Sequence, residues 1–322
     1  MIMNRQQFLG SSAALALSSA AHPVAAQTTT PIVVAPLSGP DNASVYYAQQ
    51  QGWFRQAGLD VTIQPQTSGA VAMAALIGGS AQIANSNVLS LCLAYAKGVP
   101  VAIVTPGSIY NGSVSENIQL VVAPGSPVRR AKELNGKNVA VPGLSDLFTV
   151  SIKGIVDQDG GDSASVHFVE MPPPSMVGAL QAGKIDAAGV YDPFLSAVLA
   201  VGAKAIVKPY DSIGPKFLVD CDFVYRPWAE QHRRAVSDFS AAYNRASGYV
   251  NTHYSELYPM VSQFSHIPVD VLAHMQYAEI ATTLDPGMIQ PVINAAAKYH
   301  VIPRAFPAAE LIFVPTRGKG GR

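Results

Sequence analysis

Short apolar runs alternate with helix-like segments along the first part of the chain. Strands are expected at 32–35, 61–63, 81–84 and 100–104, because each of these runs is bounded by Gly, Pro, Ser or Asn. Helices are expected between the strands, at 42–51, 69–77 and 88–96, with a glycine ending the first and the polar segment 85–87 capping the last. This alternation predicts a parallel sheet with helices on both faces.

The same pattern then begins again. Strands are expected at 118–122, 138–141, 166–169 and 185–190, with an edge strand at 205–207. Helices are expected at 143–158 and 172–182, and after residue 225 the signal becomes almost wholly helical, at 228–251, 254–264, 268–277 and 286–299. The late helices cannot form a third parallel sheet, so we expect this helical C-terminal part to pack on the first unit.

These patterns predict two parallel-rich α/β lobes joined by two hinge strands. Lobe I is expected at 27–117 and 222–322, lobe II at 118–221, and the hinges near 112–119 and 215–224. Two lobes joined in this way can close about the cleft between them.

Residues 1–26 have the features of an export signal. Arg5 is the only charged residue before position 41, an apolar stretch follows it, and the small residues at 24–26 form a cleavage site near Ala26. The apolar stretch is too short for a membrane span. We therefore expect an exported, soluble, periplasmic protein, with the choice between the general and the twin-arginine export route left open.

Charge and cysteine content exclude several classes of protein. The chain has 322 residues, of which 21 are basic and 21 acidic, so no excess of Lys and Arg favours nucleic acid or an anionic membrane as a partner. Cys92 and Cys221 are too few for a disulfide scaffold or a four-cysteine zinc site. Cys92 is expected to be a small buried apolar residue, and pairing of the two cysteines is the alternative.

Several motifs carry a resemblance to a known family. They are the segments 46–54, 57–61 and 79–83 in the first unit, and 180–187 and 191–194 in the second. In this order the chain resembles the periplasmic solute-binding proteins of ABC importers, in the nitrate, sulfonate and taurine group that also binds thiamine pyrimidine precursors. Asp192 stands where that family usually has Glu, which shortens the acidic side chain.

The resemblance implies a periplasmic-binding-protein type II-like α/β fold and a small solute bound between the lobes. It implies delivery of that solute to an ABC permease by a monomer, with no nucleic acid, cofactor or metal involved. The identity of the solute is left open.

Ligands of open parallel sheets bind beyond the carboxyl ends of the strands. Applied to the expected strands, this rule selects the segments 38–42, 67–69, 85–87, 105–110, 143–146 and 191–192. The candidate ligand-binding residues are Ser38, Asn42, Tyr46, Ser68, Asn85, Ser86, Asn87, Thr105, Ser108, Ser145, Asp146, Tyr191 and Asp192. For each of the Ser, Asn and Asp residues, the alternative is a role as a helix cap alone.

None of these six segments contains Lys or Arg. A dianion or phosphate ester would ordinarily recruit a guanidinium group, so a neutral, zwitterionic or singly anionic solute is expected. Helix N-termini and hydroxyls can hold a single negative charge, whereas Asp41, Asp146 and Asp192 could receive an amine. Sulfonates, small carboxylates and heteroaromatic solutes all stay open.

Two other classes of function compete with transport. An enzyme is disfavoured because the chain has no GxSxG, P-loop or GxGxxG motif, and because two isolated cysteines cannot supply the cysteine-rich motif of the pyrimidine-synthesising enzymes in a related branch. A ligand-sensing adaptor for a membrane receptor would use the same closing cleft as a transport protein.

Overall fold

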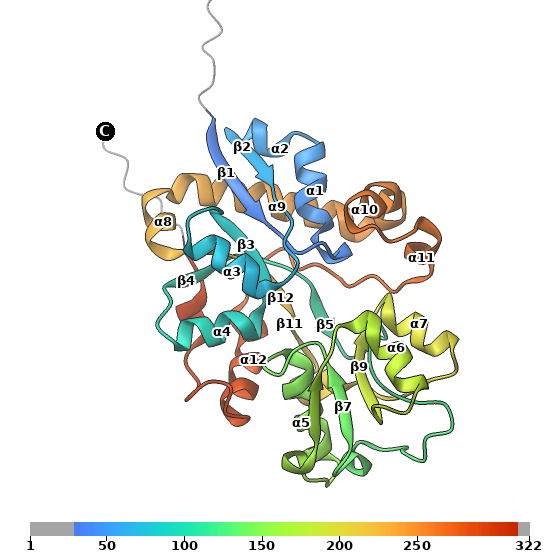
Figure 1. Ribbon diagram of the computed structural model, residues 1–322. Helices are drawn as coiled ribbons and strands as arrows, with labels where there is room; N and C mark the ends of the chain where they lie inside the picture. Colours follow the sequence, from blue (N-terminus) through green and yellow to red (C-terminus); the bar gives the residue numbers. More distant parts are fainter. Residues whose placement is uncertain (1–28, 315–322) are drawn as a thin grey trace, which may run out of the picture.

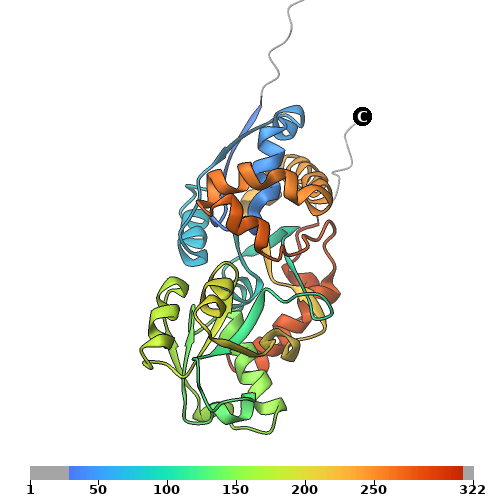
Figure 2. The same ribbon diagram turned by 90° about the vertical axis from the view of Figure 1, so that its right-hand side faces the viewer.

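The computed structural model describes residues 29–314, which form two lobes stacked one above the other (Figures 1 and 2). Each lobe is built around a five-stranded sheet, and a third sheet of two short strands lies between them. The expected export signal and its cleavage site lie outside the described residues.

The sheet of the first lobe has the order β2-β1-β3-β12-β4. Its strands are β1 (Thr30–Ala35), β2 (Leu59–Ile63), β3 (Ile83–Asn87), β4 (Val101–Pro106) and β12 (Asp220–Tyr225). β1 pairs in parallel with β2 and β3, whereas β12 runs antiparallel to both β3 and β4. β12 belongs entirely to this sheet, so the position 221/222 expected as a lobe boundary falls inside a strand of the first lobe.

The sheet of the second lobe has the order β10-β6-β9-β7-β8. Its strands are β6 (Ile118–Val122), β7 (Asn138–Val141), β8 (His167–Glu170), β9 (Ala187–Tyr191) and β10 (Lys204–Val207). β7, β8 and β9 are parallel, and β6 and β10 are antiparallel to their neighbours. Both sheets are therefore mixed, with a parallel core of the kind the sequence predicts.

Helices cover both sheets (Figure 1). The first lobe carries α1 (Ala43–Gln50), α2 (Trp53–Gln56), α3 (Gly69–Ile77), α4 (Val88–Ala96), α8 (Arg226–Gln231), α9 (Arg233–His253), α10 (Tyr258–Ser265) and α11 (Val269–His274). The second carries α5 (Leu147–Gln158), α6 (Pro173–Gln181) and α7 (Phe194–Ala200), and α12 (Pro286–Lys298) follows near the end of the chain. None of the helices in the described part of the chain is long and apolar enough to cross a membrane.

The lobes are connected by the antiparallel pair β5 (Ile109–Asn111) and β11 (Lys216–Leu218). β11 lies within the expected hinge at 215–224, and β5 ends just before the one expected at 112–119. α12 contacts both lobes at this point, because it packs on α4, β11 and α5. The Tyr299 hydroxyl, just after α12, donates a hydrogen bond to the Asp157 carboxylate of α5 over 2.9 Å.

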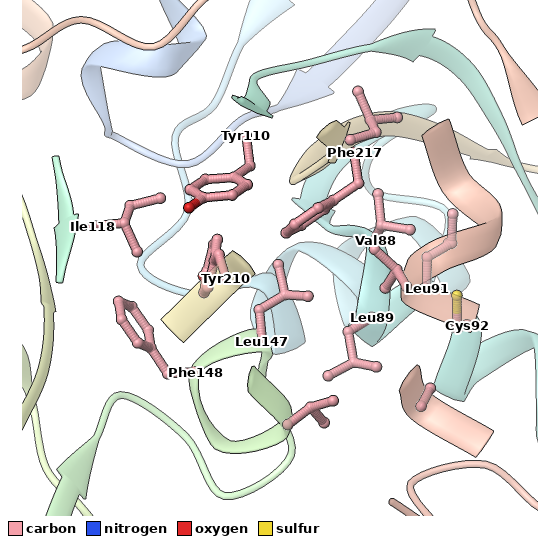
Figure 3. Close-up of a cluster of buried hydrophobic side chains, with 14 of the residues drawn as sticks. Val88, Leu89, Leu91, Cys92, Tyr110, Ile118, Leu147, Phe148, Tyr210 and Phe217 are labelled. Carbon is pink, nitrogen blue, oxygen red and sulfur yellow. The ribbon is translucent and has the colours of Figure 1, made fainter. Parts of the chain in front are cut away.

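A continuous apolar cluster runs through this connection (Figure 3). Tyr110 of β5 and Phe217 of β11 are fully buried, and their ring centroids lie 5.3 Å apart. Val88 and Leu91 of α4 pack on one side of them, and Phe148 of α5 belongs to the same cluster. The two lobes thus share apolar packing at this connection.

Candidate ligand-binding site

A cavity of about 600 Å³ lies between the lobes, lined by residues of both. This volume is in the range of pockets that enclose small organic molecules. From the first lobe it is lined by the segment 37–42 after β1, Gln66 and Thr67 after β2, Asn85, Asn87, Ser108, Ile109, Val219, Asp220, Tyr254 and the segment 275–278. From the second it is lined by Asn117, Ile118, Pro142, Asp146, Leu147, Phe148, Tyr191, Asp192 and Tyr210.

Two carboxyl groups of the first lobe face each other at the cavity. Asp41 is the middle residue of the short 3-10 helix Pro40–Asn42 after β1. Asp220 begins β12 and accepts hydrogen bonds from the backbone and the hydroxyl of Ser108. Burial raises the pKa of Asp41, and the nearby Asp220 carboxyl raises it further, to about 7. Burial also raises the pKa of Asp220, although the bonds from Ser108 act in the opposite direction.

The third carboxyl of the cavity belongs to the second lobe. Asp146 is the N-cap of α5 and accepts a hydrogen bond from the Thr149 backbone N–H over 3.1 Å. Burial raises its pKa to about 7 against the effect of this bond. The neutral and charged forms of the Asp41 and Asp146 carboxyls are therefore both populated near neutral pH.

Aromatic rings form much of the remaining wall. Tyr254 and Tyr277 of the first lobe stack with centroids 3.5 Å apart, and Phe148 and Tyr191 of the second stack at 6.2 Å. Burial raises the pKa of Tyr191 to about 12, and the charges of Asp41 and Asp146 act in the same direction. Carboxyls of both lobes therefore contribute to one negative electrostatic field around the cavity.

Eight of the residues predicted from the sequence lie together around the cavity. They are Ser38, Asn42, Asn85, Asn87, Ser108, Asp146, Tyr191 and Asp192. Asn87 also caps α4 by accepting a hydrogen bond from the Ser90 backbone N–H at 2.8 Å, and Asp192 accepts two from Ser196. For Asn87, Asp146 and Asp192, a position at the cavity is therefore combined with a local structural role.

The other five predicted residues do not line the cavity. The Tyr46 ring stacks on Phe264 at 3.9 Å. Ser68 is exposed and caps α3. Ser145 is also exposed. Ser86 and Thr105 lie inside strands and are fully buried.

The strand limits explain why Ser86 is absent from the cavity wall. β3 runs to Asn87 instead of ending at residue 84, so the polar segment expected to precede α4 continues the strand. Because side chains alternate along a strand, Asn85 and Asn87 point to one face and Ser86 to the other. On that other face, Ser86 lies against Gly69, which has no side chain to obstruct it.

The sequence pattern does not indicate the wall that comes from the C-terminal half of the first lobe. Tyr254 and the segment 275–278 lie in connections between helices, where the rule about strand ends does not apply. Asp220 was missed because it stands at the start of an antiparallel strand. The expected packing of the late helices on the first lobe is the one signal in the sequence for this wall. It implies that some of the loops between these helices can reach the cleft.

Cys92 and Cys221 are free thiols and both are buried. Burial raises the pKa of Cys92 to about 12, so this side chain behaves as a small apolar residue. Within residues 29–314, no cluster of three or more His, Cys, Asp or Glu side chains is suited to hold a metal ion.

Two α/β lobes, a two-stranded connection and a cavity between the lobes define the periplasmic-binding-protein class of fold. A solved structure of this class, the periplasmic aliphatic sulphonate-binding protein SsuA from Escherichia coli, superposes with a TM-score of 0.73 at 18% identity, covering 91% of this chain and 94% of that one. The α/β, type II-like fold implied by the sequence motifs is thereby confirmed.

The family follows from the sequence. The family described as NMT1/THI5 like matches residues 39–256, and the chain belongs to it. Among curated relatives, the putative aliphatic sulfonates-binding protein of Escherichia coli (strain K12) is 21% identical over 62% of this chain and 64% of its own length. The taurine-binding periplasmic protein of the same organism is 27% identical over 58% and 56%. The chain thus spans less than two thirds of either relative.

Proposed function

We propose that this protein captures a small organic solute between its lobes in the periplasm and delivers it to an ABC permease of the inner membrane. The observation that carries the proposal is the cavity of about 600 Å³, to which both lobes contribute polar and aromatic residues. A solute that contacts both lobes stabilises the closed arrangement over the open one, and this differential affinity is what drives closure. A permease can then distinguish the loaded protein from the empty one by its shape.

The arrangement of the connection supports closure as the working motion. β5 and β11 pair over only three residues each, so a small change in their backbone angles can rotate one lobe against the other. The apolar cluster around them and α12 lie on this side of the molecule and resist separation of the lobes there. Motion is thereby directed to the cavity side.

The relatives support binding over catalysis. Both curated relatives are named as binding proteins, and we infer the same role for this chain as a monomer that acts without a cofactor. Incubation of the purified protein with the solute it binds should return that solute chemically unchanged, as measured by mass spectrometry. Appearance of a product would instead favour the enzyme alternative.

Blocking the cavity tests the proposal directly. A Cβ atom added to Gly39 would have no neighbour within 4 Å, and the φ of this residue is −77°, so a larger side chain fits the backbone and projects at the cavity wall. A panel of amines, carboxylates, sulfonates and neutral heteroaromatics is screened on the wild type, and Gly39→Trp should abolish the rise in melting temperature that any binding member of the panel produces. Small-angle scattering should show compaction on binding in the wild type and none in Gly39→Trp.

Gly178→Trp is the matched control. Gly178 is exposed on α6 away from the cavity, and a Cβ atom there also has no neighbour within 4 Å. This variant should bind and compact as the wild type does. Binding of equal strength by Gly39→Trp, with a circular dichroism spectrum like that of the wild type, would contradict the proposed site.

A further inference from the structure

We propose that the cavity of this chain takes an organic cation, a protonated amine on an aromatic or apolar body, held between carboxylates of the two lobes. This inference rests on the proposed solute-binding function and names the chemical class of its solute. It narrows the range of neutral, zwitterionic and singly anionic solutes expected from the sequence, and it departs from the sulfonate and taurine named for the relatives.

The first argument is the balance of charge in the wall. Asp41 and Asp220 come from the first lobe and Asp146 and Asp192 from the second, whereas none of the described residues lining the cavity is Lys, Arg or His. An anion placed there would meet several carboxyl groups and no positive side chain. A cation would lie between opposite charges from both sides, where they interact more strongly than in water.

The second argument is that Asp41 has no partner of its own. No described residue donates a hydrogen bond to its carboxyl group or forms an ion pair with it, and its pKa is raised to about 7 by burial and by Asp220. A carboxyl group desolvated without compensation is costly, and an ammonium group supplies both the missing charge and the missing donors. The Tyr277 hydroxyl, in the same wall, is also buried without a hydrogen-bond partner among the described residues.

The third argument concerns the N-termini of α4 and α5, two of the places at the cavity where an anion could bind. Asp146 already accepts the Thr149 backbone N–H at the start of α5, and Asn87 accepts the Ser90 N–H at the start of α4. One of the free N–H groups at the start of each of these two helices is thus already bonded to a side chain of this chain. At α5 that side chain is itself a carboxylate, which occupies the position of an anionic ligand.

The aromatic walls fit the rest of such a solute. Tyr254 and Tyr277 stack on the first lobe, and Phe148 and Tyr191 on the second. The face of an aromatic ring attracts a cation, and rings on both lobes can enclose an apolar or flat body. The cavity thus combines carboxylates for the charge with rings for the body.

This chemistry also supplies a reason for closure. Without a solute, the charged forms of Asp41, Asp220 and Asp146 would repel one another across the cavity when the lobes close, or these groups would have to take up protons. A cation between them converts this repulsion into attraction, so it favours the closed arrangement over the open one. An anion would add to the repulsion.

Matched probes of opposite charge test the inference. 2-Phenylethylamine and 2-phenylethanesulfonate share one body, and ethylamine, ethanesulfonate and taurine form a smaller set. In isothermal titration, the wild type should bind the aromatic amine and not the matched sulfonate. Asp41→Asn and Asp146→Asn should each lower the affinity for the amine about tenfold or more. Asn remains a good N-cap, so Asp146→Asn preserves α5.

Asp60→Asn is the control, because Asp60 is exposed on β2 and does not line the cavity. It should leave the affinity for the amine unchanged. Tighter binding of a sulfonate than of its matched amine by the wild type, or amine binding that neither Asn variant weakens, would overturn the cation inference and leave the solute-binding function standing. Failure of all these probes, and of the neutral heteroaromatics and carboxylates screened with Gly39→Trp, to bind or to compact the wild type would overturn both.

Discussion

The two walls of the cavity differ in how they are joined to the rest of the molecule. In the second lobe, Phe148 and Tyr210 are at once cavity wall and part of the apolar cluster that runs through the connection. In the first lobe, Tyr254 and Tyr277 stack on each other and stay partly exposed. Tyr254 begins a short 3-10 helix between α9 and α10, and Tyr277 lies between α11 and α12, both outside the sheet. Phe148 and Tyr210 are therefore an extension of the core, whereas Tyr254 and Tyr277 form a layer that packs on the core of the first lobe.

Because of this difference, substitutions in the two walls should affect the stability of the fold and the affinity for the solute to different degrees. A change in the wall of the second lobe disturbs the core and the cavity together, whereas a change in the wall of the first lobe disturbs the cavity with little effect on the core. The two sheets also differ in buried charge. Asp222 of the first sheet is the only Asp or Glu among residues 29–314 that is almost fully buried, at 2% exposure. Substitutions in the two walls and in the first sheet should therefore differ in their effects on the free energy of unfolding and on affinity.

The largest expected effect is that of Phe148→Ala. Phe148 is 2% exposed, its ring lies 5.2 Å from that of Tyr210, and it packs against Gly189. Loss of this ring leaves a cavity in the cluster and should lower the free energy of unfolding by about 3–4 kcal/mol, as measured by urea denaturation. Phe168→Ala, on the half-buried strand β8, should cost less than half as much; equal costs would mean that the wall of the second lobe is not part of the core.

A smaller effect of opposite sign is expected for Asp222→Asn. Thr105 and Asn85 donate hydrogen bonds to the Asp222 carboxyl over 2.7 and 3.1 Å, yet burial raises its pKa from 3.8 to about 7. The folded state therefore holds this proton more tightly than the unfolded state, so stability falls as the pH rises from about 4 to about 7. The neutral amide avoids this loss and should add about 2 kcal/mol at pH 8.

The pH dependence is the decisive measurement for Asp222. Urea denaturation of the wild type and Asp222→Asn should show no gain for the variant below about pH 3, where Asp222 is protonated in both the folded and the unfolded wild type, and the full gain above pH 7. The exposed Asp60→Asn in the same sheet should follow the wild type at both pH values. A gain that does not change with pH would mean that Asp222 does not titrate in this range.

Tyr254→Ala should affect binding more than stability. The ring is partly exposed and stacks on Tyr277, so its loss should lower the free energy of unfolding by only about 1 kcal/mol. The affinity for an aromatic amine should fall about tenfold in isothermal titration, because one of the two enclosing walls is lost. If the affinity is unchanged, the wall of the first lobe does not contact the solute.

The same contrast explains which parts of the site could be predicted from the sequence. Asp146 and Tyr191 follow or end strands of the second lobe, and the rule about strand ends selects them directly. Tyr254 and Tyr277 reach the cavity only because the late helices pack back on the first lobe, a long-range arrangement that no local pattern specifies. The two lobes could be predicted because their strands repeat, whereas the antiparallel position of β12 depends on pairing between residues more than a hundred positions apart.

The smallest effect is expected for Ser68→Ala, a position that the sequence predicts for the site and the structure places outside it. Ser68 accepts a hydrogen bond from the Val71 backbone N–H over 3.3 Å and caps α3, and its side chain is exposed. The substitution should lower the free energy of unfolding by about 0.5–1 kcal/mol, as for other N-caps, and leave the affinity for every probe unchanged. Ser68→Asn, which restores a capping side chain, should recover the stability. A loss of affinity in Ser68→Ala that persists in Ser68→Asn would mean that this residue contacts the solute, and that the wall of the first lobe extends beyond Thr67 in the loaded protein.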